Sequence, residues 1–257
     1  MKKSNILLGI ILALGLVTAS VSACQNKQAE SKSTDNKNKT NNTNTSNNSN
    51  SNGAANTSTE VKPLEFAGVD IAKTGNDRAC SQYVLVVSSG TTAKIGMFEK
   101  DSSGNWNTIH ATNGYVGKDG VGQASESWSA TPAGTYTFTM AFGILPNPGT
   151  SLNYLKVNNS HYWVGDVNSS YYNKLVSKDE VPTGWDPEQS EHLIDYSPDY
   201  NYSLVFDYNS ACVPGEGSCF FFHCSTGRPT AGCVSVPQAS MVTILKNIKP
   251  GCKLVIM

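Results

Sequence analysis

The sequence predicts a mainly β fold, a β-sandwich or partly closed barrel with one or two short helices, and three features of the chain support this. Apolar or alternating runs of strand length recur between residue 83 and the C-terminus. Glycine and proline lie at nearly every boundary between these runs, where turns are expected. One good helical pattern appears close to the C-terminus. Many short strands with so little helix are typical of sandwiches and barrels.

The first strands are expected in the middle of the chain. Residues 83–87 form a continuous apolar run, as in a strand that is buried on both faces. Residues 93–99 alternate between apolar and polar side chains, which indicates a strand with one buried face. Residues 135–140 alternate in the same way and follow a Thr-Pro-Ala-Gly turn at residues 131–134.

The last third of the chain predicts further strands around a helix. Residues 202–208 and 219–223 have strand patterns. Pro237 suits the first turn of the helix and Gly251 suits its end. One face of this helix is apolar and consists of Met241, Ile244, Leu245 and Ile248. Residues 253–257 return as a final strand.

The N-terminus predicts export. Lys2 and Lys3 precede an apolar segment, residues 6–17, that is too short to span a membrane stably. The Val-Ser-Ala-Cys sequence that ends at Cys24 resembles the lipobox of bacterial lipoproteins. This resemblance implies cleavage after residue 23 and a membrane anchor through acyl chains on Cys24. The alternative is an ordinary secretory signal with an incidental cysteine, and both place the mature protein outside the cytoplasm.

Three segments are therefore expected: a signal peptide at residues 1–23, a tether at residues 24–61 and one folded domain at residues 62–257. The tether is almost entirely Asn, Ser, Thr and Lys, which cannot bury enough apolar surface to fold. The domain is long enough for one sizeable core. A net charge of −1 provides no electrostatic reason to expect nucleic acid as a partner.

Six cysteines remain once Cys24 is assigned to lipid, and disulfides persist outside the cytoplasm. Cys212 and Cys219 flank a turn-rich loop and are the best candidates for a disulfide. Closing so small a loop would contribute about 2–3 kcal/mol. The partners of Cys80 and Cys252 cannot be read from their spacing.

Residues 221–234 contain the candidate catalytic residues. His223 ends an apolar run, a turn-rich loop follows, and Cys233 comes directly after Gly232 at the start of a second run. A nucleophilic thiol needs a group that takes its proton, so adjacent strands could make His223 the base of Cys233. The backbone N–H groups of Gly232 and Cys233 would then stabilise an oxyanion. Strand alternation places Cys224 on the opposite face, as a packing or disulfide residue.

Composition alone favours a different interpretation, in which His223 and Cys233 are ordinary buried residues. Zinc is not expected, because the chain has no Cys-x-x-Cys and its other histidines have no nearby thiol. No metal and no cofactor are therefore predicted. A cysteine peptidase of another fold would need a helix that starts at the nucleophile, whereas Cys233 begins a strand pattern.

A family resemblance supports the catalytic interpretation. Residues 221–234 resemble the active-site segment of the L,D-transpeptidase (YkuD-type) catalytic domain, in which a strand ends in His and a loop leads to Ser/Thr-x-Gly-Cys. The corresponding residues here are Thr230, Ala231, Gly232 and Cys233, followed by an apolar valine. The resemblance extends over residues 83–257 and includes residues 114–122, 131–136, 141–143, 146–149, 171–175 and 206–209.

The resemblance implies cross-linking of peptidoglycan by a lipoprotein that faces the cell wall. Cys233 would attack the third residue of a tetrapeptide stem, release the terminal D-alanine and form a thioester. His223 would move the protons, and an amine of a neighbouring stem would complete a 3-3 cross-link. If water attacked instead, the protein would be an L,D-carboxypeptidase. A further alternative is a cell-wall binding lipoprotein that keeps the fold without chemistry.

The chain departs from the family pattern near the cysteine. Ala231 stands where many members have His, and Ser235 stands where many have Arg or Asn. Arg228 could replace those groups as a carboxylate ligand, or it could be a solvated loop residue. Thr230 could orient His223, line the site or cap a turn.

Overall fold

The computed structural model describes residues 63–257. The predicted signal peptide, the lipidation of Cys24 and the predicted tether lie outside the described residues. In residues 63–257, no helix is both long enough and apolar enough to cross a membrane.

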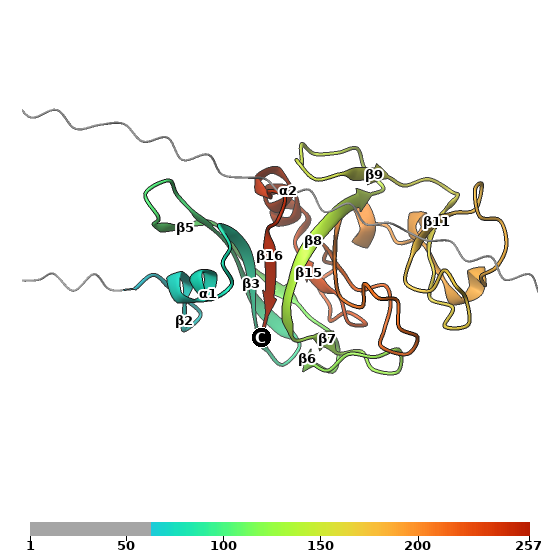
Figure 1. Ribbon diagram of the computed structural model, residues 1–257, viewed down its shortest axis with the longest axis horizontal. Coiled ribbons are helices and arrows are strands. Elements are labelled where there is room, and N and C mark those ends of the chain that lie inside the picture. Colours follow the sequence, from blue (N-terminus) through green and yellow to red (C-terminus); the bar gives the residue numbers. More distant parts are fainter. Residues whose placement is uncertain (1–62) are drawn as a thin grey trace, which may run out of the picture. The chain divides into compact units, whose positions relative to one another are not determined.

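Within the described part of the chain, eight strands form a sheet that closes on itself. They are β3 (Gln82–Ser89), β4 (Thr92–Lys100), β5 (Trp106–Tyr115), β8 (Gly134–Gly143), β13 (Ser203–Phe206), β14 (Phe221–Cys224), β15 (Val234–Val236) and β16 (Lys253–Ile256). Their order around the barrel is β13-β14-β15-β5-β4-β3-β16-β8, and the ring closes because β13 also pairs with β8. Figure 1 shows β16 between β3 and β8.

Shorter strands are added to this barrel. β9 (Tyr154–Lys156) pairs in parallel with β8. A separate three-stranded sheet has the order β11-β10-β12, formed by β10 (His161–Trp163), β11 (Leu175–Ser177) and β12 (Glu191–His192). Two small pairs complete the strands, namely β1 (Glu65–Phe66) with β2 (Val69–Asp70) and β6 (Val121–Gly122) with β7 (Thr131–Pro132).

Two α-helices and three short 3₁₀ turns occur in residues 63–257. They are α1 (Ile71–Asp77), α2 (Gln238–Asn247), η1 (Pro187–Gln189), η2 (Leu193–Asp195) and η3 (Asp199–Asn201). The Asp70 side chain caps α1 by accepting a hydrogen bond from the Lys73 N–H. With 39% strand and 13% helix, the described chain confirms the predicted mainly β fold with two short helices. The helix after Pro237 and the final strand, β16, are also confirmed, but the helix ends at Asn247 and not at Gly251 as predicted.

Strand alternation divides the apolar side chains between two cores. Phe222 and Cys224 of β14 pack with α2 residues such as Met241 in the largest core. Phe221, the neighbour of Phe222, packs on the other side with Trp163 of β10. The two faces of β14 are therefore buried against different layers, as period-two geometry requires.

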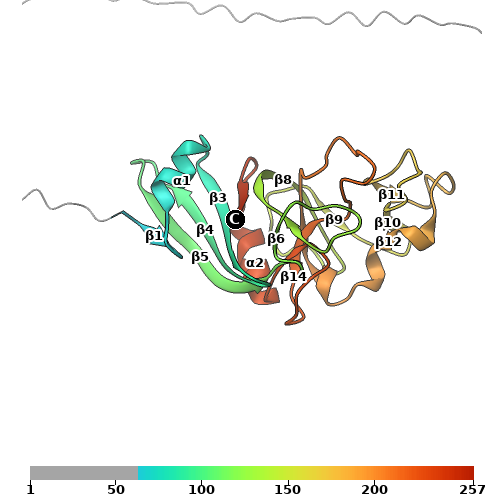
Figure 2. The same ribbon diagram turned by 90° about the horizontal axis from the view of Figure 1, so that it is seen from below.

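The second of these layers carries η3 and the three-stranded sheet. Tyr200 of η3 meets Phe142 of β8 and Phe221 of β14 edge-on, with ring centroids 5.5 Å apart in each pair. Both ribbon views place the β10–β12 sheet on the side of the barrel away from α1 (Figures 1 and 2). This arrangement brings β12 and η3 to the face of β14 that carries His223.

Candidate active site

The candidate site is built on β14 and β15, which are parallel neighbours. Phe222 pairs with Val234, and His223 pairs with Ser235. The predicted neighbouring strands are present, but the expected register was wrong, because Ser235 rather than Cys233 lies beside His223. Cys233 precedes β15 and shares its sheet face with His223 at a diagonal Cα separation expected to be about 8 Å.

The Cys233 thiol is held by backbone groups on both sides. Its Sγ atom accepts a hydrogen bond from the Phe221 N–H at 3.3 Å and donates one to the Cys219 carbonyl oxygen at 3.3 Å. The residue is 9% exposed. Burial raises the pKa of the thiol, and the negative charges of Glu191 and Asp199 raise it further. The resting residue is therefore a neutral thiol that needs a base to become a nucleophile.

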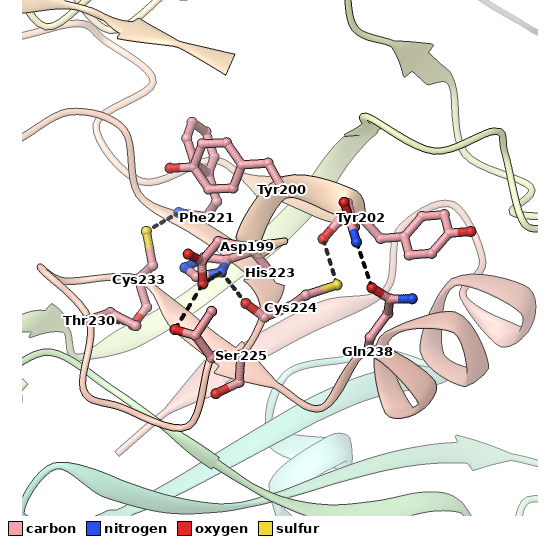
Figure 3. A network of polar contacts seen from close by, with 12 residues as sticks. Asp199, Tyr200, Tyr202, Phe221, His223, Cys224, Ser225, Thr230, Cys233 and Gln238 are labelled. Carbon is pink, nitrogen blue, oxygen red and sulfur yellow. Dashed lines mark hydrogen bonds and ion pairs between the residues drawn. The ribbon is translucent and has the colours of Figure 1, made fainter. Parts of the chain in front are cut away.

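His223 is oriented to act as such a base. Its Nδ1 lies 2.7 Å from the Cys224 carbonyl oxygen, and because a carbonyl only accepts, Nδ1 carries the proton. Nε2 of the neutral ring is then the proton acceptor. Burial lowers the pKa of His223, while the Cys224 carbonyl and the Asp199 carboxylate, 3.9 Å from Nδ1, oppose that shift. Figure 3 shows Asp199 beside His223 and the Cys224 thiol turned toward Tyr202.

No direct hydrogen bond joins His223 to Cys233 within the described residues. The offset of two residues along the strands, between Cys233 and the Ser235 position beside His223, accounts for this. The Tyr200 ring stands edge-on to the imidazole, with centroids 5.4 Å apart, and limits where that ring can move. Proton transfer from Cys233 therefore requires either side chain to lean along the strand direction or a bridging water.

Two threonine hydroxyls fix the backbone at the thiol. Thr230 Oγ1 donates to the Cys233 carbonyl oxygen at 2.6 Å, and Thr131 Oγ1 donates to the same oxygen at 3.2 Å. Thr230 Oγ1 also accepts the Gly232 N–H at 3.1 Å. This contact engages one of the two amides predicted to stabilise an oxyanion, which leaves the Cys233 N–H of that pair. Thr230 thus caps the loop at Cys233 and also lines the cavity around the thiol, while no contact orients His223 through it.

The two candidate catalytic side chains line one cavity of about 730 Å³. Its wall also includes the charged residues Lys118, Glu126, Glu191, Asp199 and Arg228. A cavity of this size is typical of a small-molecule or peptide-end site. Arg228 is exposed in the loop between β14 and β15 and has no ion pair among residues 63–257, so its guanidinium faces solvent and cavity.

A carboxylate on β12 adds an unusual charge to this cavity. Glu191 is half-buried, and its Oε2 accepts a hydrogen bond from the Tyr200 hydroxyl at 2.5 Å. Burial raises the pKa of Glu191 to about 7, and the Tyr200 hydrogen bond opposes that shift. Tyr200 therefore contacts Glu191 through its hydroxyl and His223 through its ring.

Two buried hydroxyls flank His223 without a partner. Ser203 on β13 and Ser235 on β15 are the residues paired with His223 on either side. Their Oγ atoms are buried and have no hydrogen-bond partner. An unsatisfied hydroxyl is costly, and Ser235 also lines the cavity, so it is a candidate ligand for a polar group placed there.

The predicted disulfide between Cys212 and Cys219 is wrong in this structure. All six cysteines of residues 63–257 are free thiols. Cys212 and Cys219 both have positive φ angles, and the Cys219 thiol donates to the Trp163 carbonyl oxygen. The loop between them is closed instead by the Asn209 amide, which donates to the carbonyl oxygens of Val213 and Gly217. Cys224 packs in the barrel core, as strand alternation predicted.

Sequence reasoning missed Glu191, Asp199 and Tyr200. They come from β12 and η3, which precede His223 by more than twenty residues, and no motif marks them. Thr131 was predicted only as part of a turn, although its hydroxyl reaches Cys233. In residues 63–257, no group of His, Cys, Asp and Glu side chains is arranged to hold a metal ion.

In comparisons with known proteins, no family model, no curated sequence and no solved structure matches this chain.

Proposed function

We propose that residues 62–257 are a cysteine-dependent acyltransferase, an L,D-transpeptidase that cross-links peptidoglycan stem peptides. The single observation that carries this proposal is the shared cavity of Cys233 and His223, with the thiol held between two backbone groups and Nε2 of the imidazole unprotonated. The sequence resemblance around Cys233 supplies the substrate class.

In the first half-reaction, the proton of the Cys233 thiol passes to His223 Nε2. The thiolate attacks the carbonyl carbon of the third stem residue, and the developing oxyanion accepts a hydrogen bond from the Cys233 N–H. The imidazolium then protonates the leaving amine, so D-alanine departs and a thioester remains on Cys233.

Arg228 and Lys118 are suited to hold the carboxylate of the departing D-alanine. Both line the cavity, and the segments that carry them are joined, since the Lys118 N–H donates to the Thr230 carbonyl oxygen at 3.0 Å. A guanidinium binds a carboxylate with two parallel hydrogen bonds. In the second half-reaction an amine of a neighbouring stem attacks the thioester and regenerates the thiol.

Export and lipidation of Cys24 would place this domain where peptidoglycan lies. The protein would be anchored to the membrane by acyl chains, outside the cytoplasm and facing the cell wall. A tether between anchor and domain would let the site reach an immobile polymer.

One observation favours a second candidate, a cell-wall binding lipoprotein without chemistry. The Cys233 thiol is buried among negative charges, and its pKa is raised rather than lowered. A binding protein would tolerate such a thiol, whereas an enzyme must overcome this raised pKa through His223.

The test is incubation of the full chain, in detergent, with a disaccharide-tetrapeptide. Mass spectrometry should detect loss of D-alanine, a 3-3 dimer and an acyl adduct on Cys233. Cys233→Ala should abolish all three, and Cys212→Ala is the matched thiol control that should retain them. Absence of D-alanine loss from the unmodified chain would refute the enzyme and leave the binding lipoprotein, while hydrolysis without dimers would identify an L,D-carboxypeptidase.

A further inference from the structure

Glu191 is a carboxylate that forms no ion pair with any cation of residues 63–257. The one hydrogen bond to the Glu191 carboxylate comes from the neutral Tyr200 hydroxyl. Glu99 is the contrasting case, since it pairs with the Lys249 ammonium and accepts a hydrogen bond from the Gln82 amide. Placing an unpaired carboxylate in a half-buried position is unfavourable, and a cationic ligand would relieve that cost.

The carboxylate is also held in place at the reacting centre. Trp163 of β10 pairs with Glu191 in the three-stranded sheet and packs edge-on against Phe221, with ring centroids 4.9 Å apart. Tyr200, which bonds Glu191, packs against the same Phe221 ring. Phe221 in turn holds the Cys233 thiol through its N–H. Glu191 and the thiol are thus fixed on one aromatic support, and both line the cavity.

The charges of the cavity wall come from different parts of the chain. Lys118 and Arg228 belong to two connected segments around the loop that precedes Cys233. Glu191 belongs to β12, and Asp199, whose carboxylate faces His223, belongs to η3. The cations suit the carboxylate of a donor peptide, so that group does not need Glu191, and the position of Glu191 suits a cation.

We propose that Glu191 binds the ammonium group of the acceptor and takes its first proton in the second half-reaction. This assignment rests on the proposed function, because it requires a thioester on Cys233. It makes Glu191 a second base, separate from His223, and it identifies the acceptor as a primary alkylammonium rather than a neutral amine.

The step balances as follows. The acceptor R–NH₃⁺ transfers one proton to the Glu191 carboxylate and becomes R–NH₂. Its nitrogen lone pair forms a bond to the thioester carbon, and the carbon–sulfur bond breaks with both electrons on sulfur. The second proton of that nitrogen passes through His223 to the sulfur, so the amide and the Cys233 thiol are formed. Glu191 then releases its proton to solvent.

The charge of the acceptor explains why such a base is needed. An alkylammonium has a pKa of about 10.4 and is not nucleophilic at neutral pH until it is deprotonated. A carboxyl group whose pKa burial has raised to about 7 is a better proton acceptor than an ordinary glutamate.

The experiment compares two acceptors on the full chain after acylation by the disaccharide-tetrapeptide. Nα-acetyl-lysine amide is cationic at neutral pH, whereas hydroxylamine is largely neutral there and needs no counter-charge. In Glu191→Gln, transfer to the lysine amide should fall about 100-fold, which is within the usual range for a lost acid–base group. Removing the Glu191 charge also lowers the pKa of Cys233, so the readout is the ratio of transfer to the lysine amide over transfer to hydroxylamine from the same acyl-enzyme. That ratio should fall about 100-fold, whatever the change in acylation.

Glu188→Gln is the matched control, because Glu188 is exposed on η1 and does not line the cavity. Unchanged transfer to the lysine amide in Glu191→Gln, or an equal loss with both acceptors, would overturn the assignment. If Glu191→Gln does not fold, the Nε-trimethylated lysine amide must compete with the lysine amide in the unmodified chain, and lack of competition would overturn it instead. Failure of the unmodified chain to form any acyl-enzyme would refute the proposed function itself, which is a different result.

Discussion

The Phe221 N–H donates a hydrogen bond to Cys233 Sγ at 3.3 Å, so the candidate nucleophile is anchored opposite Phe221 and not opposite its base. Ser235 occupies the position beside His223. The thiol and the imidazole therefore share a sheet face and a cavity but are offset by two residues along the strands. Groups that set the pKa of either side chain, or the loop at Cys233, should control the first step.

Asp199→Asn should shift the acidic limb of the pH–rate profile of acylation to lower pH. Burial places the His223 pKa below its ordinary value of 6.5, and Asp199 opposes that shift. Acylation should therefore be lost only below pH 6.5, as the imidazole becomes protonated. Without the Asp199 charge the His223 pKa falls further, and the Cys233 pKa falls too because a negative charge is removed.

The measurement is the rate of Cys233 acylation by a carbapenem from acidic to neutral pH, followed by mass spectrometry. Asp195→Asn is the control, because Asp195 bonds His192 and not His223. An acidic limb that moves upward in Asp199→Asn would contradict the assignment of His223 as the base.

Thr230→Val should weaken both stability and acylation. The substitution removes a donor to the Cys233 carbonyl and the acceptor of the Gly232 N–H. Leaving a buried amide unsatisfied costs about 1–3 kcal/mol, and Thr131 alone would then hold the carbonyl. Thr230→Ser keeps the hydroxyl and should behave like the unmodified chain. Urea denaturation and carbapenem acylation measure the two effects, and a fully active, equally stable Thr230→Val would show that this cap is not needed.

Arg228→Ala should raise the KM for the tetrapeptide donor about ten-fold, equivalent to about 1.4 kcal/mol of lost binding. The maximal rate should change little, because the guanidinium binds the departing residue and moves no proton. Arg228→Lys keeps the charge without the planar fork and should have an intermediate KM. A loss of maximal rate with unchanged KM would contradict a binding role.

Local patterns explain why the strands and the helix after Pro237 could be predicted. Alternation along β14 separates Cys224 from His223, and this periodicity depends only on backbone geometry. The register between β14 and β15 could not be predicted in the same way. It depends on how the intervening loop is folded, which the contacts of Thr230 with Val116 and Cys233 determine.

No sequence motif marks the carboxylates of the cavity wall that come from β12 and η3. Glu191 and Asp199 reach the cavity only because the Tyr200 and Trp163 rings pack on Phe221. Such long-range packing leaves no fixed spacing between the residues that it brings together. The expected disulfide failed for a related reason, since the spacing of Cys212 and Cys219 does not report the direction of either side chain.

The free cysteines predict that a reductant does not destabilise the fold. A disulfide across the loop from Cys212 to Cys219 would contribute about 2–3 kcal/mol, whereas the Asn209 amide closes this loop without one. Thermal unfolding of the purified chain should therefore have the same midpoint with and without reductant, and so should Cys212→Ser. Alkylation after unfolding without reductant should label all six of these thiols. Two unlabelled cysteines, or a midpoint lowered by reductant, would show that the disulfide forms after all.

Gly232→Ala should damage the site more than the same change at Gly227. Gly232 has φ +144°, and a Cβ there would overlap the Phe220 ring and approach the Ala130 carbonyl oxygen at 3.2 Å. The left-handed backbone alone costs a non-glycine residue about 1–2 kcal/mol, and overpacking adds about 1–3 kcal/mol. Gly227 also has a positive φ, +82°, but no atom lies within 4 Å of its added Cβ. In urea denaturation, Gly227→Ala should therefore be destabilised only by the backbone cost, and it should keep Cys233 acylation. Gly232→Ala should be destabilised by both the backbone cost and the overpacking, and it should lose acylation. Equal effects of the two substitutions would mean that the close packing of Gly232 on Phe220 does not position Cys233.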